Sequence, residues 1–370
     1  MGRIATNDKL KDAKRSKNDE FYTILSDIEN ELKHYKKHFR NKTILCNCDD
    51  PRISNFFHYF SYNFEKLGLK KLITTCYKNQ SVDLFSKHNS EKAIWLEYKG
   101  DKNKNNIPDP EEIGIKKLEQ DGDFRSPECI KLLEEADIVV TNPPFSLFRE
   151  YTSQLINYNK KFLVVGTWNA ISYKETFKLI KKNKLWIGIN SNRNFSGFIV
   201  PKHYPMHGTE ARVDNEGNRI VSSNNTCWFT NLDNNKRHEE FILHKNYISK
   251  EYPKYQNYNA INVDYANDIP KNYKGLMGVP ITFLDKYNPA QFEIIALGIV
   301  GSIDFTSNRK MEIIDKKTGK LTGKITLNAK GTLYRKFDPK KDKVPSFKDV
   351  KTGQLYKSIY ARVIIKNKRI

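Results

Sequence analysis

The sequence lacks the long apolar segments of membrane-spanning and exported proteins. Apolar residues make up 38% of the 370 residues, but no stretch approaches the roughly 18 uninterrupted apolar residues that a membrane span requires. The first 17 residues carry several charges and no apolar segment, so we expect no secretory signal there. We therefore expect a chain that acts in the cytoplasm without using a membrane.

Cysteine is scarce as well. The chain has five cysteines, and this odd, scattered set fits reduced thiols better than a framework of disulfides. Cys46 and Cys48 lack a second cysteine pair, and His203 and His207 have no evident third ligand. We therefore expect no metal site, because structural zinc needs four closely spaced ligands.

Several catalytic motifs are absent. The sequence contains no phosphate-binding P-loop, no Gly-x-Ser-x-Gly nucleophile turn and no zinc-binding His-Glu-x-x-His. Their absence argues against nucleotide hydrolysis, serine-hydrolase chemistry and zinc peptidase chemistry by the usual routes.

Acidic residues are in deficit. The chain has 43 Asp and Glu against 64 Lys and Arg, a net charge of +21 and a pI near 9.5. Residues 301–370 alone hold 19 Lys and Arg against 6 Asp and Glu, with aromatic residues between them. A lysine-rich solvated surface would account for part of this excess, but its concentration favours contact with nucleic-acid phosphates. The candidate contacts are Arg309, Lys310, Arg335 and Lys336 in this region, and Arg193, Lys202 and Arg212 in a polar segment before it.

Strands and helices alternate between residues 43 and 189, which predicts βαβ units and a mostly parallel sheet. Apolar runs predict the strands, and a periodicity of 3.6 residues predicts the helices. Ser126 and Pro127 predict the start of one helix, as an N-cap followed by proline at the first helical position. The expected strands are 43–48, 71–75, 93–98, 137–141, 162–165 and 185–189, and the expected helices are 19–39, 54–67, 126–135, 146–158 and 172–182.

The pattern changes after residue 189. Residues 190–225 are rich in Asn, Gly, Pro and His, and 226–232 has the composition of one more strand that joins the sheet. We therefore predict an α/β domain over residues 1–245 and an irregular α+β region over 246–370. The short strands expected in this second region are 281–284, 292–299, 325–327 and 359–365.

The candidate catalytic motif is Asn142-Pro143-Pro144-Phe145, directly after the apolar strand 137–141. Two prolines hold the backbone extended, so the carbonyl of Pro143 can point outward beside the amide oxygen of Asn142. Two acceptors on the hydrogens of an exocyclic amino group favour a pyramidal nitrogen, whose lone pair can then attack an electrophilic methyl. Phe145 can stack on a base taken out of a duplex. A Pro-Pro turn before a helix, with Phe145 in the core, is the purely structural alternative.

A second polar segment, Asn47-Cys48-Asp49-Asp50-Pro51, follows the first expected strand. In an open parallel sheet, ligands bind beyond the carboxyl ends of the strands, so this segment and residues 142–145 are expected to face one crevice. For Asp49 and Asp50, capping of the following helix is an equally good interpretation.

In this order, the motifs resemble the EcoRI-type adenine-specific DNA methyltransferases, a γ-ordered group, over residues 18–232. The resemblance implies a Rossmann-like sheet that binds S-adenosyl-L-methionine, followed by a DNA-recognition region. It implies methyl transfer to N6 of an adenine flipped out of double-stranded DNA, in a restriction–modification or related system. We expect a monomer associated with the nucleoid through DNA, with any cognate restriction endonuclease linked genetically rather than physically. The segments that carry the resemblance are Asn18–Thr23, Cys46–Pro51 with Ser54 and Phe56, Gly122–Ser126, Thr141–Phe145 and Asn225–Asn231.

The resemblance also implies roles for single residues. Asn142, Pro143, Pro144 and Phe145 would be catalytic. Phe145, together with Trp228 or Phe229, would stack on the target base. The cofactor would lie against Phe21, Tyr22, Thr23, Asn47, Cys48, Asp49, Asp50, Asp123 and Phe124, with Asp123 accepting from its adenine amino group.

The cofactor motifs depart from the family pattern. Asp49-Asp50-Pro51 replaces the usual Gly-rich loop, and the second strand ends in Thr75-Cys76 rather than in an acid that holds the ribose. Asp49 or Asp50 would then hold the ribose hydroxyls. Methylation of an RNA adenine or of another planar amino group is a competing interpretation, and so is a catalytically silent DNA-binding protein on the same scaffold.

Overall fold

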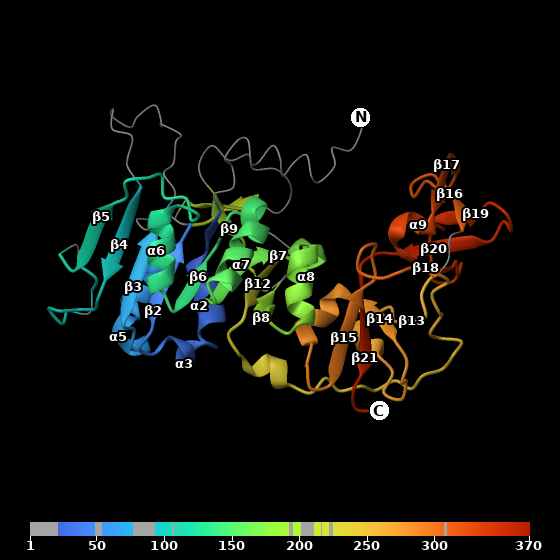
Figure 1. The fold of residues 1–370 in the computed structure, drawn as a ribbon, viewed down its shortest axis with the longest axis horizontal. Coiled ribbons are helices and arrows are strands. Elements are labelled where there is room, and N and C mark those ends of the chain that lie inside the picture. Colours follow the sequence, from blue (N-terminus) through green and yellow to red (C-terminus); the bar gives the residue numbers. More distant parts are fainter. Residues whose placement is uncertain are drawn as a thin grey trace. The chain divides into compact units, whose positions relative to one another are not determined.

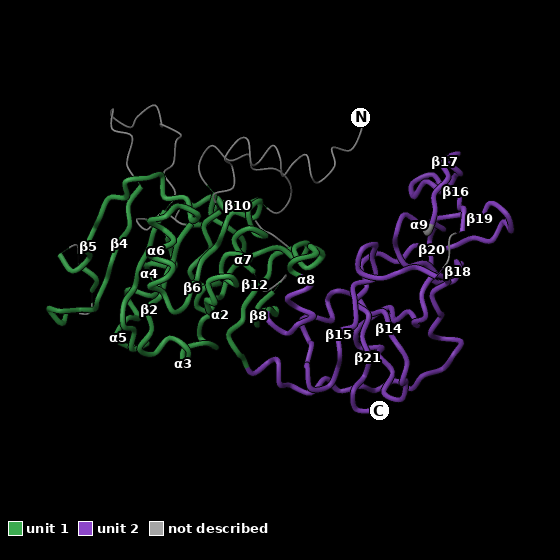
Figure 2. The backbone as a smooth tube through the Cα atoms, in the orientation of Figure 1, with its two compact units in different colours: residues 1–176, 185–234 green, residues 177–184, 235–370 purple. Residues whose placement is uncertain are grey.

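The computed structural model describes residues 21–48, 54–76, 93–105, 107–109, 111–191, 195–200, 211–215, 217–221, 225–306 and 309–370. The chain divides into two compact units (Figure 2). Unit 1 comprises residues 1–176 and 185–234, and unit 2 comprises 177–184 and 235–370. None of the helices in the described ranges is both long enough and apolar enough to cross a membrane.

Unit 1 contains a large sheet, a small sheet and the helices that cover them (Figure 1). Its helices are α2 (Leu25–Leu32), α3 (Lys36–Phe39), α4 (Asn55–Tyr62), α5 (Phe64–Leu67), α6 (Pro127–Glu135), α7 (Phe148–Asn157) and the beginning of α8 (Lys174–Lys181), with 3₁₀ turns η1 (Phe145–Leu147) and η2 (Trp168–Ser172). Its strands are β1 (Tyr22–Thr23), β2 (Thr43–Asn47), β3 (Lys71–Thr75), β4 (Ile94–Tyr98), β5 (Ile113–Lys117), β6 (Ile138–Thr141), β7 (Lys161–Thr167), β8 (Trp186–Ser191), β9 (Phe198–Val200), β10 (Ala211–Val213), β11 (Arg219–Val221) and β12 (Thr226–Thr230).

The large sheet has the strand order β5-β4-β3-β2-β6-β7-β12-β8. Its central strands β3, β2, β6 and β7 run parallel to one another. The outer pairings β3–β4, β4–β5, β7–β12 and β12–β8 are antiparallel, so the prediction of a mostly parallel sheet is wrong. The error has a simple cause: an apolar run predicts a strand but carries no information about its direction. The fold is a mixed α/β arrangement, which is consistent with a methyltransferase.

The helices agree with the predicted lengths to different degrees. Helix α6 begins after Ser126, whose hydroxyl accepts from the Cys129 amide at 3.3 Å, and ends at Glu135 as predicted. The helix expected over 54–67 is broken at Asn63 into α4 and α5. The helix expected over 19–39 begins only at Leu25, because the two residues of β1 pair with β9 instead.

Two acidic side chains of α2 are buried, which the apolar periodicity of this helix did not reveal. Glu31 is 0% exposed and accepts from the backbone amides of Ile189 and Asn190 at 2.8 and 2.7 Å. Asp27 is 2% exposed and accepts from the amide and hydroxyl of Ser196, both at 2.8 Å. Burial raises the pKa of both carboxyls above their ordinary values, although these hydrogen bonds oppose the shift. The two acids fasten α2 to β8 and to the segment that leads into β9.

Unit 2 consists mainly of two sheets, with strand orders β13-β14-β21-β15 and β17-β16-β19-β20-β18. Its only α-helical residues in the described part of the chain are α9 (Asn328–Gly331) and the end of α8, so it contains less helix than the predicted α+β region. Its strands are β13 (Ile261–Asn262), β14 (Met277–Pro280), β15 (Phe292–Leu297), β16 (Lys310–Ile314), β17 (Leu321–Leu327), β18 (Leu333–Lys336), β19 (Phe347–Asp349), β20 (Leu355–Ile359) and β21 (Arg362–Asn367).

Two strands predicted in unit 2 take another form. Residues 281–284 belong to the 3₁₀ turn η6 (Ile281–Lys286), which buries Phe283 and Leu284 without strand pairing. The strand expected over 359–365 is two strands in different sheets, because the backbone turns at Ala361 with a φ of 45°. In both cases a short apolar run indicated burial but left the backbone conformation open.

The buried carboxylate of Glu31 gives a test of the fold. Glu31→Gln places an amide NH₂ among the donors of Ile189 and Asn190, leaving buried N–H groups without acceptors. We expect the free energy of unfolding, measured in urea, to fall by about 2–3 kcal/mol. Because burial raises the pKa of Glu31 in the folded state, its stabilisation is greatest at low pH and decreases as the pH rises through that folded pKa. The difference in free energy of unfolding between the unaltered chain and Glu31→Gln should therefore become smaller as the pH rises.

Glu29→Gln is the matched control, since Glu29 is an exposed residue of the same helix. Equal unfolding midpoints for the two variants would mean that Glu31 does not hold α2 in place.

Candidate active site

The carboxyl ends of the parallel strands bring together segments that are far apart in the sequence. β2 ends at Asn47 and its neighbour β6 ends at Thr141, whose hydroxyl donates to the Asn47 carbonyl across 94 residues of sequence. Asn142 to Phe145 follow directly. The two polar segments that the sequence predicted to share one edge of the sheet therefore lie side by side where they are described.

The amide of Asn142 is the central feature of this edge. Its side chain is buried, with only 6% of the residue exposed. Nδ2 donates to the Phe21 carbonyl at 2.5 Å, while the buried Oδ1 has no partner among the described residues. A buried acceptor without a donor costs about 1–3 kcal/mol. The arrangement therefore fixes the amide with an unused acceptor, which is the property of a ligand-binding group.

The two prolines and Phe145 surround this acceptor. Pro144 has φ −54° and ψ 123°, an extended conformation, and its carbonyl accepts from Leu147 at 2.9 Å to begin η1. No hydrogen bond to the Pro143 carbonyl is found within the described residues. Phe145 is half-buried at the margin of the core, so the purely structural alternative does not describe it fully.

Phe145 is held by two other phenylalanines. Its ring is nearly parallel to that of Phe21, with centroids 6.0 Å apart and an interplanar angle of 19°. Phe198 of β9 meets it at 5.9 Å and 73°. Phe198 could not be predicted from the sequence, because only the pairing of β1 with β9 brings it to this edge.

The β1 segment also contributes a second buried polar atom that has no partner among the described residues. Thr23 is 1% exposed, and its Oγ1 has no hydrogen bond within the described ranges. The Thr23 carbonyl accepts from Asn55 Nδ2 of α4 at 2.8 Å, so the segment is fixed against the start of that helix. Tyr22 lies between these two positions and pairs with Ile199.

Asn47 and Cys48 form the turn at the end of β2. Asn47 is 5% exposed, and its Oδ1 accepts from the hydroxyl of Tyr151. Burial raises the pKa of Tyr151 well above its ordinary value, which keeps the phenol a donor. Cys48 has a φ of 80°, the left-handed conformation that a Gly-rich loop would supply here. The contact of Tyr151 with Asn47 was not predicted, because the spacing of Tyr151 on α7 indicates only that it faces the core.

The turn continues into residues that lie outside the described ranges. These include Asp49 and Asp50, the two acids expected to hold a ribose. The described chain resumes at Ser54, which caps α4 by accepting from the Phe56 amide at 3.2 Å.

The loop that carries Asp123 is fixed by a glycine. Gly122 has a φ of 78°, and a side chain there would collide with the Cys76 carbonyl at the end of β3. Asp123 accepts from Arg125 Nε at 2.9 Å and from Arg125 Nη2 at 2.7 Å. These hydrogen bonds from Arg125 hold the pKa of Asp123 below its usual range. Arg125 also reaches Glu150 of α7 at 2.8 Å, a partner that spacing in the sequence does not reveal.

Phe124 is buried next to this loop. Its ring meets Tyr151 edge-on at 5.0 Å, and its carbonyl accepts from Gln154 Nε2 at 3.0 Å. The predicted cofactor residues Asn47 and Phe124 are thus joined through one tyrosine.

Trp228 and Phe229 belong to the core around β12. Both are 0% exposed in β12 and point to opposite faces of the sheet. Trp228 packs edge-on against Phe56 at 6.1 Å, and Phe229 packs against Phe148 at 5.0 Å. Both rings therefore pack in the core, and the buried Trp228 Nε1 has no hydrogen-bond partner among the described residues.

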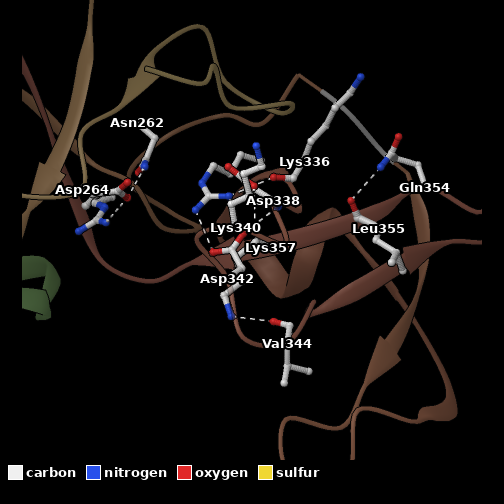
Figure 3. A network of polar contacts seen from close by, with 12 residues as sticks. Asn262, Asp264, Lys336, Asp338, Lys340, Asp342, Val344, Gln354, Leu355 and Lys357 are labelled. Carbon is white, nitrogen blue, oxygen red and sulfur yellow. Dashed lines mark hydrogen bonds and ion pairs between the residues drawn. The ribbon is translucent and has the colours of Figure 1, made fainter. Parts of the chain in front are cut away.

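Of the predicted DNA-contacting residues in unit 2, Arg335 is buried. It is 4% exposed and donates to both oxygens of Asp342 at 2.7 and 2.9 Å. Asp342 belongs to the polar network of Figure 3. Arg309 is exposed but forms an ion pair with Asp349 at 3.3 Å. The remaining candidates divide into Lys310, Lys336 and Arg212, which are exposed, and Arg193 and Lys202, which lie outside the described residues.

The sequence is similar to the proteins of one known family. The sequence model of the family described as adenine-specific methyltransferase EcoRI matches residues 9–368. The Type II methyltransferase M.EcoRI of Escherichia coli is 55% identical over 80% of this chain and 90% of its own length. No solved structure gives a significant match.

Two relatives from Mycoplasma are more distant. Type II methyltransferase M.MgeORF184P of Mycoplasma genitalium is 42% identical over 76% of this chain and 84% of its own. Type II methyltransferase M.MpnI of Mycoplasma pneumoniae is 38% identical over 76% and 83%. With a family model matched over nearly the whole chain and relatives at these identities, the chain belongs to the EcoRI family of adenine-specific methyltransferases.

Proposed function

We propose that this chain transfers a methyl group from S-adenosyl-L-methionine to N6 of an adenine taken out of double-stranded DNA, within a restriction–modification system. The observation that carries the proposal is the buried Asn142 Oδ1, an acceptor without a described donor beside Pro143 and Phe145. Three relatives are named Type II methyltransferases, and the family description names adenine as the specificity. We propose that the parallel strands at the centre of the large sheet form a Rossmann-like sheet that binds the cofactor.

S-adenosylmethionine, when bound, supplies a methyl group made electrophilic by its sulfonium. The groups at the carboxyl edge fit such a molecule. Thr23 Oγ1 is a buried polar atom without a described partner, and Cys48 supplies a sharp turn at the end of β2. The Asp123 carboxylate keeps lone pairs beyond those that Arg125 uses, and would accept from the adenine amino group.

The chain's own groups would act on the amino group of the target adenine. Asn142 Oδ1 and the Pro143 carbonyl would each accept one N6 hydrogen, which favours a pyramidal nitrogen with a localised lone pair. The N6 lone pair would attack the methyl carbon in line with the carbon–sulfur bond, which breaks. The methylated nitrogen would then lose a proton to solvent. Burial of Asn142 strengthens both hydrogen bonds, because water does not compete for them.

The ring of Phe145 would carry the target base. Phe21 lies over one face and Phe198 meets its edge, so the ring is held from two sides and offers its other face. We do not assign base stacking to Trp228 or Phe229, because both are fully buried by packing within the sheet.

We propose that residues 246–370 provide the DNA-recognition region. Here the hairpin formed by β16 and β17 offers Lys316, Lys320 and Lys324, which are exposed and form no ion pair with a described residue. Lys310 and Lys336 are exposed as well, whereas the charge of Arg335 is already used by Asp342. With catalytic and DNA-binding groups in one chain, a monomer acting on the nucleoid in the cytoplasm is the simplest arrangement.

Asn142→Ala removes the proposed acceptor. We expect the single-turnover rate of methyl transfer to fall by roughly 100- to 1,000-fold or more, by analogy with the loss of one preorganised hydrogen bond at other active sites. Binding of S-adenosylmethionine, measured by calorimetry, should change little. Asn157→Ala, at the exposed end of α7, is the control and should retain full activity. Full activity in Asn142→Ala would sink the catalytic assignment.

Phe145→Leu and Phe229→Leu separate stacking from packing. Since stacking on an aromatic side chain contributes about 1–3 kcal/mol per base, Phe145→Leu should slow methyl transfer by roughly 5- to 150-fold. It should also change the fluorescence of 2-aminopurine placed at the target position. Phe229→Leu should lower the melting temperature with little effect on the rate of the folded enzyme. The opposite pattern would assign the stacking role to β12.

The hairpin lysines are tested by salt dependence. Replacing Lys320 and Lys324 with Gln should reduce the slope of log affinity against log salt concentration by about two, because two phosphates would no longer be neutralised. The double variant of Lys182 and Lys184, two exposed lysines elsewhere in unit 2, controls for net charge. Equal slopes in the two double variants would remove the hairpin from the DNA interface.

A further inference from the structure

The loop between β4 and β5 has no role in the chemistry described above. It closes directly on the ends of both strands, because Tyr98 pairs with Ile113. Tyr98 also pairs with Leu72, near the start of β3. The loop therefore lies at the end of the sheet where the parallel strands begin, whereas Asn47 and Asn142 lie where those strands end (Figure 1). A ligand bound by this loop would be remote from the active site.

The loop carries oxygen-bearing residues at a regular spacing. Counting Asp101 as the first position, oxygen donors stand at positions 1, 3, 5, 9 and 12, and position 7 offers a backbone carbonyl. This is the ligand spacing of the twelve-residue calcium loop of EF-hands, with asparagine in place of the usual glycine at position 6. Half of the donors are neutral, so the pattern is not merely an acidic cluster. The six positions are Asp101, Asn103, Asn105, Ile107, Asp109 and Glu112.

The side chains at these positions turn inward and meet. Asn103 Nδ2 and Asn105 Nδ2 both donate to the same oxygen of Asp109, at 2.6 and 2.7 Å. Asp101 Oδ1 accepts from the Asn105 amide at 3.2 Å, and Glu112 Oε1 accepts from the Lys102 amide at 2.6 Å. The oxygens of the same two amides accept from the backbone amides of Asn105 and Ile107 at 3.0 and 2.8 Å, so a cation at the centre of the loop would require both side chains to give up these contacts and turn.

Tyr98, at the end of β4, lies beside this cluster of carboxylates and is 1% exposed. Burial, and then the charges of Glu112, Asp101, Glu65 and Asp109, raise the pKa of Tyr98 to about 12. Four carboxylates therefore gather around one tyrosine in a chain of net charge +21. Neither Asp109 nor Glu112 has a described Lys or Arg as its ion-pair partner.

The donor set selects the kind of ligand. In the described part of the chain, no three His, Cys, Asp or Glu side chains are grouped closely enough to hold a metal by themselves. A cation here must also use amide and backbone carbonyl oxygens, which suits a hard ion with six to eight oxygen ligands. Mg²⁺ demands a smaller octahedral shell, and zinc prefers nitrogen and sulfur.

We propose that this loop binds one Ca²⁺ through Asp101, Asn103, Asn105, Asp109, Glu112 and the carbonyl of Ile107. The ion would neutralise the gathered carboxylates and fasten the β4–β5 hairpin. The chain runs from β5 directly to Gly122 and Asp123, so the ion would also steady the strand that leads into the proposed cofactor loop.

The test uses the full chain after treatment with a chelator. Titration with Tb³⁺ under excitation at 280 nm should give luminescence sensitised by Tyr98, which CaCl₂ displaces and equal MgCl₂ does not. Calorimetry with CaCl₂ should give one site, and the melting temperature should rise by about 2–4 °C at saturating Ca²⁺. Glu112→Gln and Asp101→Asn should each weaken Ca²⁺ binding at least tenfold.

Glu111→Gln is the matched control, because it removes the same charge from an exposed neighbour that is not at a ligand position. It should bind Ca²⁺ like the unaltered chain. The proposal is overturned if the folded, unaltered chain shows no Tb³⁺ signal and no heat with millimolar CaCl₂, or if Glu112→Gln binds as tightly as Glu111→Gln. None of these measurements depends on methyl transfer, so their outcome is separate from that of the proposed function.

Discussion

The hydrogen bond from Asn142 Nδ2 to the Phe21 carbonyl decides which atom of the amide is left for chemistry. An asparagine side chain offers a donor end and an acceptor end, and either could face a ligand. Because the donor end is used within the protein, the acceptor end remains buried and without a described partner. An acceptor held in this way would favour a ligand with N–H groups over a ligand without them. An aspartate at this position could not make the same hydrogen bond and would place a charge there.

That single contact depends on a series of others. The Phe21 carbonyl is in place because β1 pairs with β9. β9 follows Ser196, which is held by the buried carboxylate of Asp27 on α2. Glu31, one turn further along α2, holds the end of β8 that leads into the same segment. Two buried acids on a helix therefore position an amide oxygen on the other side of the site, and the cost of burying them is offset by the hydrogen bonds that they accept.

The sequence allowed prediction of those features that are local. The strands β2 and β3, the capped helix α6 and the Asn-Pro-Pro-Phe motif are each specified by neighbouring residues, and the structure has them at or within a residue of the expected positions. Features assembled from distant segments were missed. Arg125 beside Glu150 and Phe198 beside Phe145 both depend on contacts that no spacing in the sequence encodes. The antiparallel direction of β4 and β12 was missed for the same reason.

Charge illustrates the same limit at the scale of the whole chain. A net charge of +21 predicts a polyanionic partner but does not say which cations meet it, since Arg335 is paired with Asp342 and Arg309 with Asp349. The loop between β4 and β5 shows the reverse case. Lys102 and Lys104 lie within it, yet both are exposed and neither neutralises the carboxylates of Asp109 and Glu112. Because these nearby lysines do not pair with Asp109 and Glu112, a small ion that takes many oxygen ligands matches the two carboxylates better than a side chain of the protein does.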